Sequence, residues 1–312
     1  MNNKYTKHAF ALCLISVFIA FFSSCNTDDG PINNKIPEYK QIVNKGFVHT
    51  MRLTRISFNT NNINKPLEFY FYYNQDSKLD SIKRLIDKDS VIMLNKITDK
   101  TAVLTNPLKG FESSYTSTLG ENALLSKAHV KTSFTDNDVK GEIVTDASAT
   151  FKDNFLSRYI INSTAVFTNA GGKKVENKSS SNIHMVWHND LIVYADQECT
   201  GDSAVIKSNY NGKVHYEFSY PGTFRNPGIF WVLCSFFNYM VEPTVFGMPT
   251  DMCGAMGVEP RYLPERVIIY KDNGERLEHK FTYRFMNDEE NVIEVSDISA
   301  FPVRTATVII SK

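Results

Sequence analysis

The chain has 312 residues with 34 basic and 34 acidic side chains and 42% hydrophobic residues, so its formal net charge is zero. A chain of this length and hydrophobicity can bury a sizeable core, as one large domain or as two smaller ones. Lysine and arginine are scattered singly or in short groups such as Lys83-Arg84. Because nucleic-acid binding needs a basic stripe that neutralises phosphates, this composition argues against a nucleic-acid partner.

Residues 1–24 have the pattern of a signal peptide. Lys4 and Lys7 give a basic start, and a largely apolar stretch follows at residues 9–22. At about 1.5 Å per residue this stretch reaches about 21 Å as a helix, short of the ~30 Å hydrocarbon core of a bilayer. The sequence therefore predicts a leader that is removed and not a permanent span. Its loss leaves 32 basic and 34 acidic side chains, a net charge of −2.

The residues at the expected cleavage site resemble the lipobox of bacterial lipoproteins. Ser23 and Ser24 are small, and Cys25 follows them directly after the apolar stretch. The resemblance implies that the Cys25 thiol receives a diacylglyceryl group and that the new amino terminus is acylated. Two or more acyl chains hold a protein firmly, because each buried methylene contributes about 0.8 kcal/mol. A membrane partner through this anchor is the expectation, and ordinary cleavage or an uncleaved anchor are the alternatives.

Residues 25–39 are expected to form the lipidated cysteine and a flexible tether. This segment is rich in Asn, Asp and Gly, with Pro31 and Pro37 as breakers. Asp28 and Asp29 resemble the export signal that sends Bacteroidetes-type lipoproteins to the outer face of the outer membrane. The expected location is the outer membrane, with surface display and a periplasm-facing position both open.

Three cysteines remain for the exported domain: Cys199, Cys234 and Cys253. An odd number argues against a disulfide framework as the organising principle. One pair, such as Cys234 with Cys253, could close a loop in an oxidising compartment. Buried thiols are the other interpretation.

Residues 40–312 are expected to form one exported β-rich domain, with a possible break into two subdomains near residues 180–200. Its recurring unit is an alternation of apolar and polar residues, a turn rich in Asn, Asp and Gly, and a second alternation. In Leu67–Tyr73, the odd-numbered residues are apolar or aromatic, whereas Glu68, Tyr70 and Tyr72 share the other face. This pattern predicts a mainly β fold, an antiparallel meander of repeated hairpins that curls.

Two turns are expected to define hairpins most clearly. Asn211-Gly212 would join residues 204–210 to 213–220, because Asn-Gly supplies the positive φ angles of a two-residue turn. Residues 272–274 would join 267–270 to 276–285. Further turns are expected at 120–122, 136–138, 170–172, 189–190 and 287–290, and a last strand at 303–310.

One short buried helix is expected near residues 228–241. Apolar residues recur there at steps of three and four, Pro227 precedes the start and Pro243 follows the end. The segment is apolar almost all round, so the concave face of the sheet is its expected environment.

Repeated hairpins, a buried helix, and a Gly-rich loop that leads through Tyr262-Leu263-Pro264 into a strand from Val267 resemble a family of Bacteroidetes lipoproteins with a domain of unknown function. The resemblance covers roughly residues 60–300. It implies an outer-membrane lipoprotein of the cell envelope and brings no catalytic residues, because the family has no assigned activity.

The sequence offers no catalytic or metal motif, so no catalytic residues, no metal and no cofactor are expected. His184 and His188 are four residues apart, but along a strand this spacing is about 13 Å, too far to share an ion. The acidic clusters at 136–142 and 288–290 lack the spacing of a calcium loop and are typical of hairpin turns. A hydrolase built from residues distant in sequence remains a third class.

Aromatic side chains are the remaining candidates for binding. Tyr70, Tyr72, Trp187, Tyr216 and Tyr220 could form an exposed platform for sugar rings, or they could simply stabilise the sheet. Tyr70 and Tyr72 share the face of Glu68, and with Trp187 they are the predicted ligand-binding residues.

The leading hypothesis is a lipid-anchored, non-enzymatic envelope protein that binds a glycan or an envelope protein. The alternatives are a carrier of an apolar molecule, in an open half-barrel with residues 228–240 as its lid, and a structural envelope component.

Overall fold

The computed structural model describes residues 52–59, 67–73, 75, 79–87, 90–97, 102–105, 111–120, 124–136, 139–168, 172–201, 211–220, 224–237, 256–287, 291–300 and 303–311. These residues form sixteen strands and one helix, α2 (Phe230–Phe237). The strands are β1 Arg52–Asn59, β2 Leu67–Tyr73, β3 Leu79–Asp87, β4 Ser90–Ile97, β5 Ala102–Thr105, β6 Phe111–Leu119, β7 Leu125–Asp136, β8 Val139–Lys152, β9 Phe155–Thr168, β10 Lys174–His188, β11 Leu191–Gly201, β12 Gly212–Ser219, β13 Arg266–Lys271, β14 Arg276–Phe285, β15 Val292–Asp297 and β16 Arg304–Ser311.

The strands form a single antiparallel meander that closes on itself. Each strand pairs with its neighbours in sequence, and β1 also pairs with β16, with Ile56 opposite Val308. The mainly β antiparallel fold predicted from the hairpin pattern is confirmed, and its curl is complete. The pairing of β1 with β16 also corrects the open half-barrel expected for a carrier, because it leaves the described sheet without a free edge. Residues 180–200 span the end of β10, the turn at 189–190 and most of β11, and the two strands pair with each other at ten positions.

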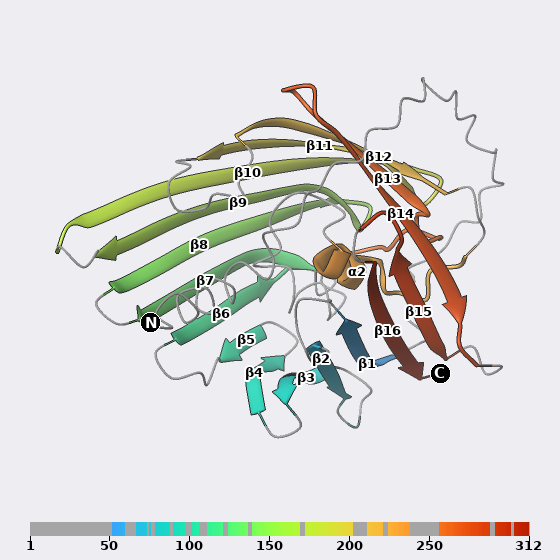
Figure 1. Cartoon of the computed structure of the whole chain (residues 1–312), viewed down its shortest axis with the longest axis horizontal. Helices are drawn as coiled ribbons and strands as arrows, with labels where there is room; N and C mark the ends of the chain where they lie inside the picture. Colours follow the sequence, from blue (N-terminus) through green and yellow to red (C-terminus); the bar gives the residue numbers. More distant parts are fainter. Residues whose placement is uncertain are drawn as a thin grey trace, which may run out of the picture.

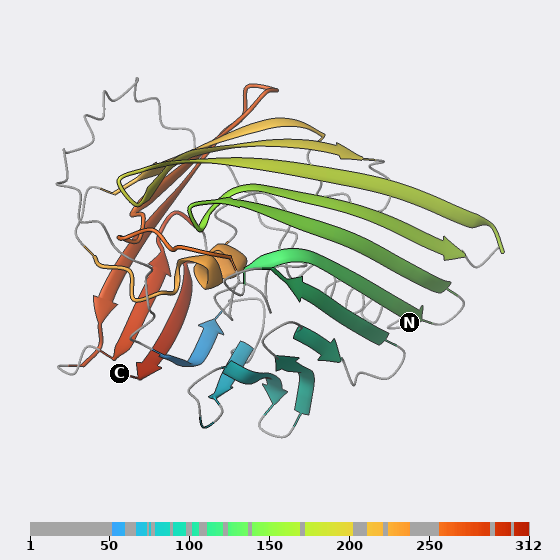
Figure 2. The same cartoon turned by 180° about the vertical axis from the view of Figure 1, so that it is seen from behind.

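Strand lengths differ strongly around the ring. Strands β8, β9 and β10 have 14, 14 and 15 residues, whereas β5 has 4 and β13 has 6. The long strands therefore project to the left of α2 in Figure 1, and Figure 2 shows the short strands β2 to β5 at the opposite side of the ring. We call the end of the barrel where β8 turns into β9 and β10 into β11 the α2 end.

Two predicted turns are confirmed. The turn at residues 189–190 joins β10 to β11, and Asn189 and Asp190 have φ angles of 50° and 62°. The turn at 272–274 joins β13 to β14, and Gly274 has a φ of 88°. The expected turns at 120–122, 136–138, 170–172 and 287–290 include residues outside the described part of the chain, and β16 occupies the predicted last strand.

Two turns differ from expectation. The prediction of a two-residue turn at Asn211-Gly212 is wrong, because residues of β12 pair with residues 194–199 of β11 and not with 204–210. The connection between β11 and β12 is therefore longer than two residues. The turn at Asp153-Asn154 was missed, although both residues adopt positive φ, 52° and 67°, as a tight hairpin requires.

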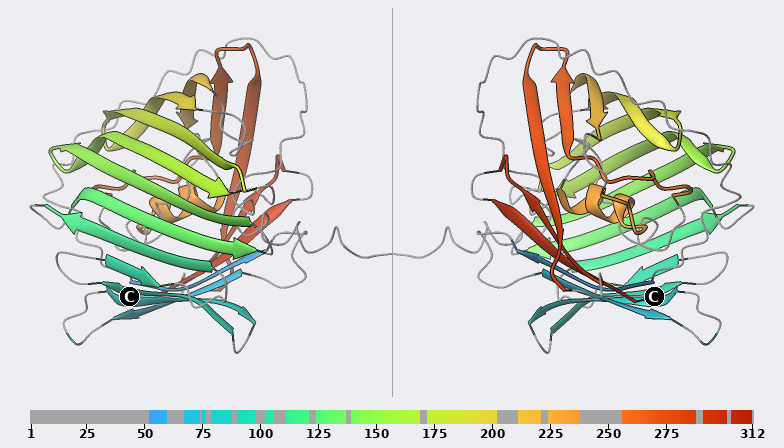
Figure 3. Two further views of the ribbon diagram at one scale, coloured as in Figure 1. Left: turned by 90° about the vertical axis from the view of Figure 1, so that its left-hand side faces the viewer. Right: turned by 90° about the vertical axis from the view of Figure 1, so that its right-hand side faces the viewer.

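The predicted buried helix is confirmed as α2, which lies inside the ring of strands (Figure 3). Its side chains are apolar on nearly every side, and Phe230, Leu233 and Phe237 are each fully buried. They belong to one hydrophobic cluster with inward-facing residues of β1, β2 and β6 to β16. Among the residues that the structure describes, no helix has the length and apolar character to cross a bilayer.

Candidate functional site

The two faces of the closed sheet have opposite chemistry. Along β10, Lys174, Glu176 and Lys178 are exposed, whereas Ile183 and Met185 are buried. The buried positions contact the cluster that includes α2, so the buried face is the inner one. A strand alternates its side chains between two faces, so this pattern makes the outer surface polar and the interior apolar.

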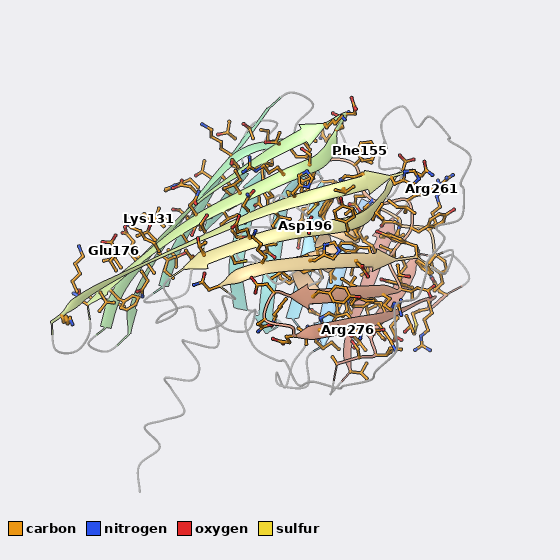
Figure 4. All side chains as sticks on the ribbon, turned by 90° about the horizontal axis from the view of Figure 1, so that it is seen from above. Lys131, Phe155, Glu176, Asp196, Arg261 and Arg276 are labelled. Atoms are coloured by element: carbon orange, nitrogen blue, oxygen red, sulfur yellow. The ribbon has the colours of Figure 1, made fainter. Side chains whose placement is uncertain are left out.

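Charged residues on the outer face are matched across neighbouring strands. Figure 4 looks onto this surface from above and labels Lys131, Glu176, Asp196 and Arg276 on β7, β10, β11 and β14. Ion pairs and hydrogen bonds join Lys131 to Glu142 at 2.7 Å and His215 to Asp196 at 2.7 Å. Such exposed pairs add little stability, about 0–1 kcal/mol each, but they show that this surface faces water.

This polarity is the reverse of that in a barrel that spans a bilayer, where the outer face is apolar and the interior polar. An Arg or Lys on the lipid face costs about 2–4 kcal/mol at the midplane. Strands β7, β10 and β14 each carry more than one outward Lys or Arg. The described outer face is therefore unsuited to lipid, and the apolar surface of this protein lies inside.

Aromatic residues dominate the α2 end of the interior. We call Trp187, Phe218, Phe230 and Trp231 the aromatic end. The two tryptophan rings lie 6.4 Å apart between centroids, and the rings of Phe230 and Trp231 lie 5.0 Å apart. The indole nitrogen of Trp187 donates to the carbonyl of Leu156 at 2.7 Å, which fixes its ring against β9. These two tryptophans are the only ones in the chain.

The amino end of α2 is held by two buried polar residues. The side-chain oxygen of Asn226 accepts from the backbone N–H groups of Gly228 and Ile229 at 3.0 and 2.9 Å. Glu259 accepts from the N–H of Phe230 at 2.7 Å and from the Asn226 amide at 2.9 Å. A carboxylate at this position satisfies free backbone donors and complements the helix dipole. The start of α2 is thus fixed although it lies in an apolar interior.

The carboxyl end of α2 meets a buried ionic cluster. Asp297 on β15 is fully buried and pairs with Arg304 and with His279, the latter at 3.2 Å. Arg304 also donates to the backbone carbonyl of Phe237 at 3.2 Å. Burial alone would raise the pKa of the Asp297 carboxyl, but His279, Arg304 and a hydrogen bond from Ser299 hold that pKa well below its ordinary value.

The segment 256–265 ties the α2 end to two hairpin turns. The N–H of Val258 donates to the carbonyl of Asn154 at 2.9 Å, and the N–H of Arg261 donates to that of Asp190 at 2.9 Å. Gly257 packs so closely that an added Cβ would lie 2.3 Å from the Asn154 carbonyl oxygen. These contacts join the helix region to the strands β8 to β11.

Farther from α2, the inner wall carries neutral polar side chains. We call Thr145, Ser163, Asn177, Ser181, Gln197 and Tyr216, on β8 to β12, the inner polar band. The hydroxyls of Thr145 and Ser163 lie 2.7 Å apart, and the Gln197 amide donates to the Ser181 hydroxyl at 2.8 Å. The Tyr216 hydroxyl donates in turn to Gln197. The members of the band are neutral, and these five of them are hydrogen-bonded to one another in pairs or chains.

Asn177 differs from its neighbours in this band. Its side chain is 7% exposed, and its amide nitrogen has no hydrogen-bond partner among the described residues. A buried donor without an acceptor costs about 1–3 kcal/mol. The alternation of β10 places Asn177 on the same inner face as Ser181 and Trp187. This residue is therefore a costly polar group that points into the barrel.

The structure separates the three predicted ligand-binding residues. Tyr70 and Tyr72 lie on the outer face of β2, and Tyr72 is 46% exposed. Cations lie over both rings: Arg55 is 5.4 Å from the Tyr70 centroid and Lys83 is 5.9 Å from that of Tyr72. Trp187 points into the barrel, so it does not share a surface with the two tyrosines.

The other aromatic candidates also lie away from Tyr70 and Tyr72. Tyr216 is fully buried in the inner polar band, and Tyr220 is partly buried with its hydroxyl donating to the carbonyl of Ile192 at 3.1 Å. Their side chains contribute to the interior and not to an exposed platform.

Cys199 and Cys234 are buried, and Cys25 and Cys253 lie outside the described residues. His184 and His188 are exposed on the outer face of β10. Within the described part of the chain, no group of three or more His, Cys, Asp or Glu side chains is arranged to hold a metal ion.

The inner polar band was not predicted from the sequence. Its signal is present in β10, where Asn177, Ser179 and Ser181 occupy alternate positions between the apolar residues Val175 and Ile183. Residues at every second position of a strand lie on one face of the sheet, so these polar residues share the face of Val175 and Ile183. The pattern shows that these residues share a face, but not that this face is the interior.

Comparison with solved structures places this fold beside two proteins from Bacteroides. A porin-like protein from Bacteroides vulgatus has a TM-score of 0.57 at 12% sequence identity, with 84% of this chain and 98% of that chain covered. A porin-like protein from Bacteroides uniformis has a TM-score of 0.46 at 12% identity, covering 83% and 96%. No family model matches the chain, and no curated protein matches it. At this identity, the likeness to the first structure shows a shared fold and nothing finer.

Proposed function

We propose that the protein is a lipid-anchored envelope protein that carries an apolar molecule inside its barrel. The observation that carries this proposal is the reversed polarity of the sheet, with ion pairs outside and one continuous apolar cluster inside. An apolar molecule in water gains most from a dry, enclosed and apolar environment. The helix α2 lines and closes one end of that environment.

The shape of the fold supports this role. A barrel of sixteen strands is wider than the eight-stranded barrels whose side chains fill the interior. The described helix has 8 residues, about 12 Å in length. The aromatic end offers large apolar surfaces to a ligand, and the segments that hold α2 bond to the hairpin turns around it.

The location in the envelope and the anchor belong to the same proposal. The expected lipidation of Cys25 supports it, as does the fold likeness to a porin-like protein from Bacteroides vulgatus. A polar outer surface fits a body that is tethered beside a membrane and not inserted in it. Radiolabelled palmitate should mark the native protein and not a Cys25→Ala variant; equal labelling of both would contradict the anchor.

Native mass spectrometry tests the carrier function directly. Protein gently extracted from its own cells should show a mass above that of the acylated chain, and the excess should match an extractable lipid. A clean mass of the acylated chain alone, together with no uptake of added lipids, would contradict a carrier and favour a structural role.

A glycan-binding surface is the second candidate, because Tyr72 is 46% exposed and lies beside Tyr70 on the outer face. The hydrogen bond from Tyr70 to Glu68 at 2.8 Å fixes one of these rings. Affinity electrophoresis should then show retention by a polysaccharide that is lost in the Tyr70→Ala, Tyr72→Ala variant. No retention across a broad panel of polysaccharides would remove this candidate.

A further inference from the structure

We infer that the carried molecule is an amphiphile with an uncharged head, such as a hydroxyl, ester or amide, and that Asn177 donates a hydrogen bond to an oxygen of that head. This inference rests on the proposed carrier function and names the chemistry of its ligand.

The position of Asn177 supports this role. It lies on the inner face of β10 opposite Ala165 of β9, and one row farther along Ser179 lies opposite Ser163. The Asn177 side chain is 93% buried, and its amide nitrogen lacks an acceptor among the residues described. A ligand oxygen at this point would satisfy the donor, and an apolar ligand without one would leave the donor unsatisfied.

Neighbouring polar groups of the band already bond to each other. Gln197 bonds to Ser181 and accepts from Tyr216, and Thr145 bonds to Ser163. These contacts hold the wall in one arrangement before a ligand arrives. A pre-organised wall with an open donor at Asn177 selects a head with a well-placed acceptor.

The inner wall formed by β8 to β11 favours a ligand with an uncharged head. The inward-facing residues of β8 to β11 that the structure describes are apolar or neutral polar, and the charged residues of these strands lie on the outer face. The inward Arg304 on β16 is already paired with Asp297. A carboxylate or phosphate head would lose its hydration here without gaining a cation, so binding favours an uncharged head.

The neighbours of Asn177 on the inner face of the sheet are uncharged. Ala165 lies across from it on β9 with Ile143 beyond on β8, and one row along the sheet Ser163 and Thr145 follow on the same two strands. The large side chains gather at the aromatic end, so the tail of an amphiphile gains most by pointing toward α2.

The test uses the Cys25→Ala protein, which lacks the predicted anchor and can be titrated without detergent. Isothermal titration calorimetry at pH 7 would compare 1-dodecanoylglycerol with dodecanoate, which have the same acyl chain and differ in the charge of the head. We expect the uncharged probe to bind at least 10-fold more tightly. Equal affinity, or tighter binding of dodecanoate, would overturn the inference.

Variants at position 177 test the proposed donor. The valine and threonine side chains have nearly the same shape as each other, but only threonine in Asn177→Thr keeps a hydrogen-bond donor. We expect Asn177→Val to weaken binding of 1-dodecanoylglycerol by about 5- to 30-fold, and Asn177→Thr to weaken it less. Asn182→Val, on the outer face of the same strand, is the matched control and should leave the affinity unchanged.

The outcomes separate the two proposals. If both probes bind alike and Asn177→Val has no effect, the carrier function stands and the inference about the head is wrong. If neither probe binds and neither alters the fluorescence of Trp187 and Trp231, the carrier function itself fails. A lower urea midpoint of Asn177→Val with unchanged affinity would mean that Asn177 bonds within the protein, which also overturns the inference.

Discussion

The aromatic end and the inner polar band line the same barrel but stabilise it differently. Trp231, Phe230 and Leu233 at the aromatic end are buried among large side chains, and the polar groups of Asn226 and Glu259 beside them are bonded. In the inner polar band the side chains are neutral and polar, and the Asn177 donor has no acceptor among the described residues. The comparison indicates that the packed aromatic end stabilises the barrel. In the inner polar band, the unsatisfied donor of Asn177 lowers the stability, and a ligand that supplies an acceptor would restore it.

The largest effect is expected at the aromatic end. Trp231→Ala removes a side chain that is 2% exposed and in contact with Trp187 and Phe230. The lost burial and the cavity should lower the free energy of unfolding by about 3–5 kcal/mol, measured by urea denaturation. Tyr72→Ala, at an exposed outer position, should change it by less than about 1 kcal/mol. Similar losses for both variants would contradict the division between interior and exterior.

The ionic cluster beside α2 should give the next largest effect. Asp297→Asn leaves the half-buried Arg304 without its fully buried carboxylate partner, which should lower the free energy of unfolding by about 3 kcal/mol at pH 7. An unchanged urea midpoint would show that the carboxylate does not hold the end of α2.

The same carboxyl predicts a dependence of stability on pH. Its pKa is lower in the folded protein than the ordinary value near 4, so its stabilising effect is complete above about pH 5. The effect is lost as the pH falls below about 4 toward the folded pKa. The free energy of unfolding should therefore drop in acid, and it should drop less in Asp297→Asn. The same pH dependence of this free energy in both proteins would contradict the prediction.

A smaller loss of folding stability is expected where the segment 256–265 contacts the β8–β9 turn. Gly257 has a φ of 86°, and an added Cβ would meet the Asn154 carbonyl oxygen at 2.3 Å. Gly257→Ala should therefore destabilise by about 1–3 kcal/mol. Gly274→Ala is the matched control, because Gly274 has a φ of 88° but no atom near the added Cβ. If the two variants lose the same stability, the close contact does not matter and only the backbone angle does.

The smallest effect, and one of opposite sign, is expected in the inner polar band. Asn177→Leu replaces an unsatisfied buried donor with an apolar side chain of similar size, so the ligand-free protein should keep its stability or gain up to about 1 kcal/mol. A loss of 2 kcal/mol or more in the free energy of unfolding, measured by urea denaturation, would contradict a destabilising effect of Asn177 in the ligand-free protein.

Local patterns in the sequence were sufficient for strands such as Leu67–Tyr73 and for the turns at 189–190 and 272–274. The alternation in Leu67–Tyr73 places Phe69 and Phe71 on the buried face, and Asn189-Asp190 forms a two-residue turn. The Asn211-Gly212 prediction failed because a favourable turn dipeptide does not fix which residues the following strand pairs with. Closure of β1 on β16 joins strands from opposite ends of the chain, so no local pattern contains it.

The candidate site was harder to predict for a physical reason. Alternation divides a strand into two faces but does not say which one becomes the interior, so Trp187 was grouped with Tyr70 and Tyr72 although it faces the opposite side. Asn177, Gln197 and Tyr216 come from three strands, and only the register of the sheet brings them to one wall.

Detergent phase partitioning of the Cys25→Ala protein tests the central claim most directly, because it asks which face of the barrel meets water. Without acyl chains, a body whose outer face is charged should enter the aqueous phase, folded and without detergent, while the native protein enters the detergent phase. Recovery of folded Cys25→Ala protein in the detergent phase would mean that the outer face binds lipid, which contradicts an interior built for an apolar molecule.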